Sequence, residues 1–355
     1  MQRRRWLDEH AFAELVAVTN LLPGPSSSQL GIAIGTLRAG PPGGVAAWVG
    51  FTLPSAAAMA ALGLGIGRAD VSDAGWLQGL ELAAAAVVLT AVIAMARSLA
   101  PDLPRLAVAA GAAAVALLVA GPLGQTLTIV AAGVLGALAF RRLVQPVTLD
   151  LRLPFGPRAA AACLAALAVL LVGLPVVRDV TGSQAAALAA AMTRAGTLVF
   201  GGGHVVLPLL DESVVEPGWV DEEEFLAGYG AAQAVPGPLF TFSAYLGAVE
   251  RPEPNGVPGA VLALVAIFLP SFLLLGGVLP LWSSLRRRAS LQAALVGVGA
   301  AVVGLLAAAF WDPVFTGSVD GLGDGAVAAA LLALLRAAPP WAVVAVGALA
   351  GALLL

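Results

Sequence analysis

Two Pro-Gly-Pro triplets interrupt apolar segments of the chain. Pro23-Gly24-Pro25 is followed by Ser26, Ser27, Ser28 and Gln29, whereas Pro236-Gly237-Pro238 is followed by two apolar residues before Thr241. Lipid cannot satisfy the backbone groups that such breaks free, so the breaks should face protein or a wet cavity. Hydroxyls and free amides at a half-helix start suit an anion. We expect two non-equivalent breaks that line a path, the alternative being kinks that serve packing only.

A third break, Phe200-Gly201-Gly202-Gly203-His204, would let backbone amides approach a ligand closely. His204 is predicted to add a donor or a titratable proton, the alternative being a hydrogen-bonded structural histidine. Arg194, ten residues earlier, is a cation within an apolar segment and a natural counter-charge for an anion. Its alternative is snorkelling or a structural pair with an acid. Glu14 has no acidic counterpart in the second half and is a candidate proton carrier.

These considerations define a candidate site without catalytic or metal-ligating residues. The proton-coupling candidates are Glu14 and His204. The substrate-binding candidates are Asn20, Pro23, Gly24, Pro25, Ser26, Ser27, Gln29, Arg194, Gly201, Gly202, Gly203, His204, Gln233, Pro236, Gly237, Pro238 and Thr241.

The composition is that of a membrane protein. Of 355 residues, 60% are hydrophobic and 11% charged, against about 25% charged in a soluble domain. All 18 basic residues are Arg, too few for a nucleic-acid footprint, and the single cysteine, Cys163, excludes an intramolecular disulfide. The two histidines lie in different halves, which argues against an embedded enzyme, and no cofactor is expected. Acidic residues soon follow the basic N-terminus, so we interpret it as mature protein.

Apolar runs predict an all-α, polytopic fold, since a spanning helix needs about 20 such residues. The approximate segments are 11–37, 43–67, 76–97, 104–121, 123–140, 158–177, 186–209, 225–249, 257–284, 290–310, 325–337 and 340–355. A polar stretch, 143–157, separates two groups of segments.

An internal repeat organises these segments. WLDEHAFAELVAVTNLLPGP recurs as WVDEEEFLAGYGAAQAVPGP at an offset of 213, pairing Asn20 with Gln233, and Leu53-Pro54-Ser55 later matches Leu269-Pro270-Ser271. We predict a first repeat at 1–142, a linker with an inverting helix at 143–185 and a second repeat at 186–355. The segment 186–209 has no counterpart in the first half, so either the true start lies upstream or that half has lost its opening helix.

The unpaired helix 158–177 would invert the second half, as in many secondary transporters. Three arginines precede the first copy whereas the loop before the second has no cation, which agrees with inversion and a cytoplasmic N-terminus. If 11–37, 186–209 and 225–249 are re-entrant, fourteen Arg lie inside and three outside, with Arg194 embedded; if all segments cross, the best split is eleven inside and six outside. The re-entrant arrangement is favoured.

The chain resembles the long form of the chromate ion transporter family. The motifs are WLDEHAFAELVAVTNLLPGPSSSQLGIAIGTLRAGPPGGVAAWVGFTLPS in the first half, then FGGGHVVLPLL, WVDEEEF and AVPGPLFTFSAYLGA. The family usually opens its first half with a Phe-Gly-Gly motif, which is missing here. The resemblance implies two homologous, oppositely oriented halves that export chromate across the bacterial plasma membrane by the proton-motive force, with sulfate as the competing dianion.

Other readings remain open. One is a permease for sulfate or another oxyanion, and one is a non-transporting membrane subunit. The expected partners are chromate or sulfate and membrane lipid, with a homodimer left open and no nucleic acid.

Overall fold

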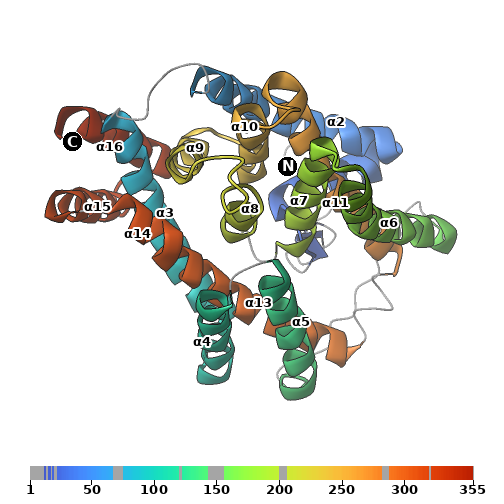
Figure 1. Ribbon diagram of the computed structural model, residues 1–355. Coiled ribbons are helices and arrows are strands. Elements are labelled where there is room, and N and C mark those ends of the chain that lie inside the picture. The colour runs from blue at the N-terminus through green and yellow to red at the C-terminus, as the bar shows by residue number, and fades with distance from the viewer. Residues whose placement is uncertain are drawn as a thin grey trace.

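The structure, a computed structural model, describes residues 12, 15, 16, 18, 19, 22–66, 75–119, 122–142, 156–199, 206–281, 288–319 and 321–354. Within these ranges the chain forms helices and turns, with no strand (Figure 1). The polar stretch that was predicted to join the two halves lies almost entirely outside the described residues.

Five helices are long and apolar enough to cross a membrane, which makes the chain a multi-pass membrane protein. They are α2 (Ser26–Ile66), α3 (Gly75–Leu99), α6 (Pro157–Thr181), α11 (Gly256–Val278) with its 3-10 extension, and α13 (Ala289–Ala309) with the π-helical segment Phe310–Phe315 and the short α14 (Thr316–Ser318) that follow it. The all-α membrane fold expected from composition is therefore confirmed.

Helix α2 is folded back on itself at Ala39 and Gly40. Gly40 has a φ of +66° and both residues leave the helical conformation, so the chain reverses where two prolines follow. Gly35 and Gly43 touch across the bend. This bend falls between the predicted segments 11–37 and 43–67, and it makes α2 a hairpin rather than one span.

Two central helices are broken at or near the glycine and proline positions. The first pair is α7 (Gln184–Leu198) and α8 (Val206–Val214), and the second is α9 (Glu222–Ala234) and α10 (Phe242–Val249), which a short 3-10 turn, η2 (Leu239–Thr241), precedes. Each of these helices is shorter than a span of about 20 residues.

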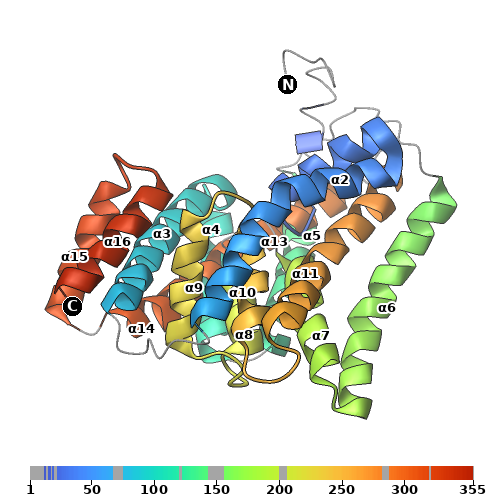
Figure 2. The same cartoon turned by 90° about the horizontal axis from the view of Figure 1, so that it is seen from above.

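The α9–α10 pair enters and leaves at one face of the molecule. Arg251 forms an ion pair with Asp221, and its amide donates to Trp219 O at 2.9 Å, so the two ends of the hairpin meet. Tyr245 Oη donates to Glu224 O at 2.8 Å, which joins α10 to the first turn of α9. In Figure 2 the loops α6–α7, α8–α9 and α10–α11 all lie along the lower edge.

Two outer hairpins pack on the opposite half of the chain. The pair α4 (Leu103–Leu118) and α5 (Pro122–Ala139) lies against α13, whereas α15 (Leu322–Leu334) and α16 (Pro340–Leu354) lie against α3. Glycines let the backbones approach, since Gly136 meets Gly297 in the first contact and Gly79 meets Gly347 in the second. Each half therefore holds the outer hairpin of the other.

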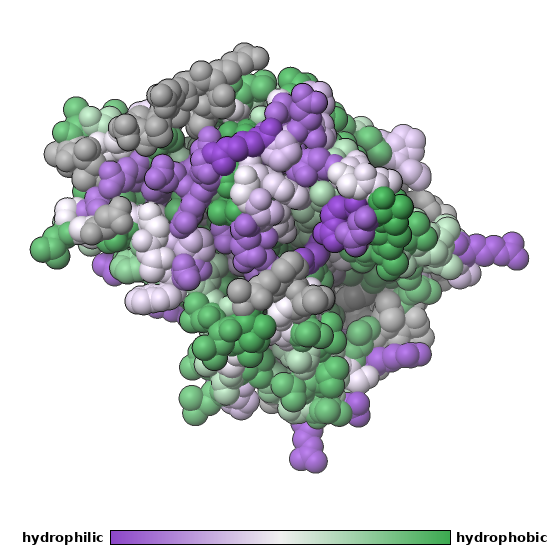
Figure 3. Space-filling model, viewed as in Figure 1, coloured by the Kyte–Doolittle hydropathy of each residue, from purple (hydrophilic) through white to green (hydrophobic). Residues whose placement is uncertain are grey.

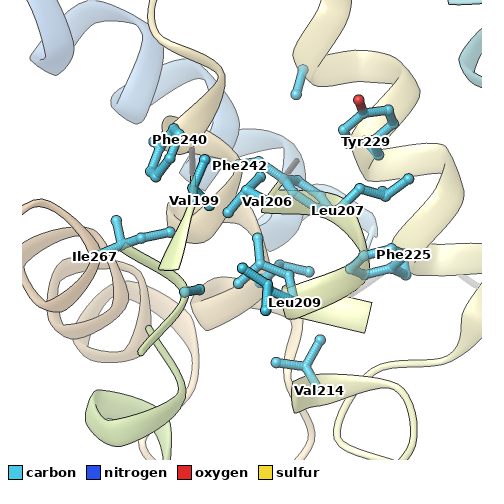
Figure 4. Packing of buried hydrophobic residues seen from close by; sticks show 14 of the residues in the cluster. Val199, Val206, Leu207, Leu209, Val214, Phe225, Tyr229, Phe240, Phe242 and Ile267 are labelled. Atoms are coloured by element: carbon cyan, nitrogen blue, oxygen red, sulfur yellow. The ribbon is translucent and has the colours of Figure 1, made fainter. Parts of the chain in front are cut away.

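Aromatic and aliphatic side chains fill the space around the two central hairpins. Figure 4 shows Val199 and Val206, on either side of the α7–α8 break, in one buried cluster with Phe240, Phe242 and Ile267. By contrast, α6 stands at the rim (Figure 2) and exposes valines such as Val172, which is 66% exposed. Gly24 and Pro25 of the first Pro-Gly-Pro break are buried, as the cost of unsatisfied backbone in lipid requires, whereas Pro236 and Gly237 of the second are exposed at the surface of the described residues.

Candidate functional site

The first Pro-Gly-Pro break is held by contacts from three helices. Gly24 has a φ of +111°, a region that favours glycine, and its amide donates to Val199 O at 2.6 Å at the end of α7. Gln29 Nε2 donates to Pro23 O at 2.5 Å. A Cβ on Gly24 would lie 2.6 Å from Gln29 Nε2 and 2.9 Å from Ser271 Oγ, so both polar atoms reach this glycine.

Buried polar oxygens at and beside this break lack hydrogen-bond partners among the described residues. They are Ser28 Oγ, Gln29 Oε1 and Ser271 Oγ. Their residues are 1%, 0% and 0% exposed, respectively. Because a buried polar group without a partner costs free energy, such a concentration marks a place built for a polar ligand or water.

The helical phase of α2 separates the serines that follow the break. Ser26 is half-buried and Ser27 is exposed, whereas Ser28 is buried. Ser28 and Ser271 were not among the predicted ligand residues. The repeated Leu-Pro-Ser sequence was a signal for Ser271. No such signal exists for Ser28, because three consecutive serines have the same hydropathy and the sequence does not show which of them points inward.

At the second Pro-Gly-Pro break, the side-chain hydroxyls bond to backbone carbonyl groups of the break itself or just after it. Thr241 Oγ1 donates to Pro238 O at 2.9 Å and Ser243 Oγ donates to Phe240 O at 2.8 Å. Phe240 packs against Phe268 of α11 with ring centroids 5.9 Å apart. Here the hydroxyl hydrogens are already used, in contrast to the first break. Gln233 lies in the last turn of α9, just before this break.

The two breaks make reciprocal contacts across the molecule. Gly24 in the first half lies beside Ser271 of the second half, and Gly237 in the second half lies against Ser55 of the first. Since Ser55 and Ser271 occupy matching positions of the repeat, the same contact is made twice with the halves exchanged.

Helix α7 separates the first break from a cavity of about 760 Å³. On one face, Gly196 touches the backbone of Ile267 and approaches Gly24. On another face, residues at helical spacing line the cavity, namely Ala187, Ala190, Ala191 and Arg194. Arg194 therefore faces this cavity rather than the proline break, and the structure does not bring the two together.

Arg194 is paired with an acid that the sequence analysis missed. Its guanidinium lies 3.6 Å from Glu212 Oε1 of α8, with side chains 25% and 3% exposed. The chain reverses between α7 and α8, and Gly203 stands midway between positions 194 and 212. A chain reversal expected at the triple glycine would place positions 194 and 212 opposite each other, so the sequence contained a signal for this ion pair. The structural ion pair left open for Arg194 is thus present, and the cation also lines a cavity.

An acidic cavity of about 310 Å³ lies on the other side of Glu212. Its carboxyl groups come from Asp211, Glu212, Glu216, Glu222 and Asp312. Glu212 and Glu216 line both cavities. Figure 3 shows hydrophilic residues gathered in the middle of this face, with hydrophobic ones over α4 and α5. Among the described residues no group of three potential metal ligands is suitably clustered.

Several predicted site residues lie outside the described residues: Asn20, Glu14, Gly201, Gly202, Gly203 and His204. The hydrogen bond from Gly24 to Val199 nevertheless brings the first break to the residue at which α7 ends, two positions before the triple glycine.

Comparison with known proteins decides the family. The sequence model for chromate transporters matches residues 1–138 and 186–352, most of the chain. The chain belongs to the chromate transporter family. This chromate transporter family member is 30% identical over 330 residues to a chromate transport protein of Pseudomonas aeruginosa, covering 88% of this chain and 73% of that protein. It is 26% identical over 335 residues to a probable chromate transport protein of Synechococcus elongatus, covering 87% and 76%.

A third relative of this family member is an uncharacterized transporter of Methanocaldococcus jannaschii, 23% identical over 316 residues that cover 87% of the chain and 76% of the relative. No solved structure matches the chain. The family assignment made from the sequence motifs is confirmed.

Proposed function

We propose that this protein is a secondary active transporter that exports chromate across the bacterial plasma membrane, driven by the proton-motive force. The names of its relatives and the family match support chromate as the substrate. The observation that carries the site is the set of buried, unpartnered oxygens at and beside the first Pro-Gly-Pro break. Sulfate, a tetrahedral dianion of similar size, should compete.

The binding site we propose centres on the first break. A tetrahedral dianion needs several converging donors, and backbone amides at a half-helix start supply them with the aid of the helix dipole. The donors would come from Gly24 to Gln29, with Ser271 added from α11. The triple glycine and His204 follow Val199 closely in sequence, so they complete this site in the proposal.

The second break and Arg194 have different parts in the proposed path. The second break shapes the path chiefly with its backbone, because the Thr241 hydroxyl is already bonded to Pro238 O. Its residues in the proposal are Gln233, Pro236, Gly237, Pro238 and Thr241. Arg194 attracts the anion into the open cavity on the other face of α7. The α7–α8 hairpin is then the barrier that must move between the cavity and the break.

The reciprocal contacts support two repeats, at 1–142 and 186–355, joined by the segment 143–185 that contains α6. An inverted pair with re-entrant hairpins around a central site is an architecture of alternating-access carriers. The exposed apolar surface of α6 and the outer hairpins would contact membrane lipid. Glu14 and His204 remain candidate proton carriers.

Uptake of labelled chromate into proteoliposomes, with and without excess sulfate, tests the function. We expect saturable flux that sulfate inhibits. Gln29→Leu should reduce the flux at least ten-fold while the protein still inserts and keeps its thermal stability in detergent. Gln125→Leu, a change of the same kind at a glutamine outside the proposed site, serves as the matched control. Sulfate flux without chromate flux would indicate a permease for another oxyanion, and no flux of either anion would indicate a non-transporting subunit.

A further inference from the structure

Glu212 lies in the walls of two cavities that differ in charge, since the larger is lined by two arginines and two glutamates and the smaller, among the described residues, by carboxyl groups without a cation. Toward one side lies the cavity of about 760 Å³, whose walls include Arg178 and Arg194. Toward the other lies the cavity of about 310 Å³, which four further carboxyl groups line. The side chain of Glu212 is only 3% exposed, yet it is shared by both cavity walls. Glu212 is thus placed to exchange a proton with the acidic cavity while it contacts Arg194 in the wall of the larger cavity.

The pair that Glu212 forms with Arg194 is loose. A charge-assisted hydrogen bond has a donor to acceptor distance of about 2.7–2.9 Å, whereas this pair is separated by 3.6 Å. Desolvation of a buried ion pair offsets much of its attraction, so such pairs lie close to energetic balance. A competing anion or a proton can therefore separate Glu212 from Arg194.

We infer that Glu212 is a proton-binding residue of the transport cycle, which in its neutral form releases Arg194 to bind the dianion. This inference rests on the proposed function. When the dianion leaves, Glu212 gives up its proton and pairs with Arg194 again. One proton then moves with each dianion, so the occupied carrier bears one net negative charge more than the empty one. An inside-negative membrane potential drives that charge outward, whereas a pH gradient that is acid outside opposes the exit of the proton, so the membrane potential is the component of the proton-motive force that drives export.

The charged groups around Glu212 set the sign of the pH effect. Arg194 on α7 favours the carboxylate, and Arg178 on α6 lines the same cavity. Asp211 and Glu216 flank Glu212 in sequence, while Glu222 on α9 and Asp312 after α13 face the acidic cavity. These four acids favour the neutral form. Among the described residues that line the two cavities, those of α5 and α13 carry no charge. Lower pH should therefore tighten anion binding.

Binding of sulfate to the purified full-length protein in detergent measures this directly. Sulfate is the probe because it stays a dianion between pH 6 and pH 8, whereas chromate itself takes up a proton in that range. In the wild type, the Kd should rise at least ten-fold from pH 6 to pH 8. In Glu212→Gln, the Kd should stay within about three-fold of the wild-type value at pH 6 at both pH values. Glu222→Gln, which removes an acid from the acidic cavity only, should keep a pH-dependent Kd, shifted toward lower pH because one of the acids that favour neutral Glu212 is lost.

Proteoliposomes supply the second readout. With a pH-sensitive dye inside, wild-type chromate flux should move protons in the same direction as the anion. Glu212→Gln should retain chromate exchange at equal pH within about three-fold and lose the proton signal. Unchanged proton movement and pH dependence in Glu212→Gln, beside normal exchange, would overturn the inference alone. Absence of both anion binding and exchange in the wild type would overturn the proposed function and the inference with it.

Discussion

The two Pro-Gly-Pro breaks share a sequence and a position in the repeat but differ in how their polar groups are used. At the first, a serine and a glutamine side-chain oxygen next to the break, and Ser271 across from it, are buried without partners. At the second, the hydroxyls of Thr241 and Ser243 donate to backbone carbonyls one turn away, and a phenylalanine stands where the first break has serine.

This difference is what we expect if the first break serves the ligand and the second serves the framework. A buried polar group that is satisfied internally contributes to stability, whereas an unsatisfied one lowers stability unless a ligand completes it. The hydroxyls of the first break therefore have the character of a binding site and those of the second that of a brace, while Gln233 Nε2 beside the second break is also buried without a partner among the described residues. Exchanging single groups between the two breaks tests the distinction.

The largest effect is expected at the glycine of the first break. Gly24→Ala places a side chain at a φ of +111° and within 3 Å of Gln29 and Ser271, a strain of about 1–3 kcal/mol. We expect chromate flux into proteoliposomes to fall at least a hundred-fold. Gly31→Ala in α2, where a Cβ meets no neighbour within 4 Å, is the control and should leave flux unchanged. Equal losses in both variants would show that α2 tolerates no added methyl group and that Gly24 is not special.

The paired serines give the sharpest comparison. Ser271 Oγ has no partner among the described residues, whereas Ser55 Oγ donates to Thr52 O at 3.0 Å. A hydrogen bond to a charged ligand contributes about 1.5–3 kcal/mol. Ser271→Ala should therefore raise the KM for chromate about ten-fold or more, while Ser55→Ala should change it less than two-fold. A larger effect at Ser55, measured by initial rates of uptake, would reverse the assignment of the two breaks.

The sequence was sufficient for most of the fold. Hydropathy located nearly every helix within a few residues, as for α6, predicted at 158–177 and observed at Pro157–Thr181. Clusters of proline and glycine marked the helix breaks because they remove backbone hydrogen bonds, whereas the single prolines Pro54, Pro175 and Pro270 lie inside helices that continue past them. What hydropathy could not supply was the pairing of α5 with α13 and of α16 with α3, since apolar helices of similar composition carry no pattern that selects a partner.

The candidate site was less accessible from the sequence. Gly24 and Gln29 could be predicted because they lie in the break itself or directly after it. Ser271 could not, because its role depends on the contact between the break of the first half and α11 of the second. Arg194 was recognised as an embedded charge, whereas its acid, Glu212, depends on a chain reversal whose exact centre the sequence leaves open. Short-range chemistry was thus predictable, and long-range apposition was not.

A smaller effect is expected at the glycine of the second break. Gly237 lies against Ser55, and a Cβ there would come within 2.5 Å of Ser55 Cβ. Gly237→Ala should lower stability by about 1–3 kcal/mol through overpacking, read as a lower Tm in detergent, with flux per folded molecule reduced two- to three-fold. Ser55→Gly in the same chain removes the obstructing atoms and should restore part of the Tm, because the φ of +157° at position 237 still disfavours a side chain. Failure of this rescue would mean that the contact between the halves does not limit the packing.

The smallest effect should follow the loss of the Thr241 hydroxyl, although the sequence places this residue among the ligand candidates. Thr241→Val keeps the shape of the side chain but removes the donor to Pro238 O, so one buried hydrogen bond is lost at a cost of about 1 kcal/mol. Because that donor is engaged with the backbone, chromate KM and maximal flux should both stay within two-fold of wild type while the Tm falls slightly. Thr128→Val, which removes a hydroxyl bonded to its own helix in α5, calibrates the stability change. A rise in KM confined to Thr241→Val would mean that the anion draws this hydroxyl away from Pro238 during transport, and the second break would then bind substrate as the first does.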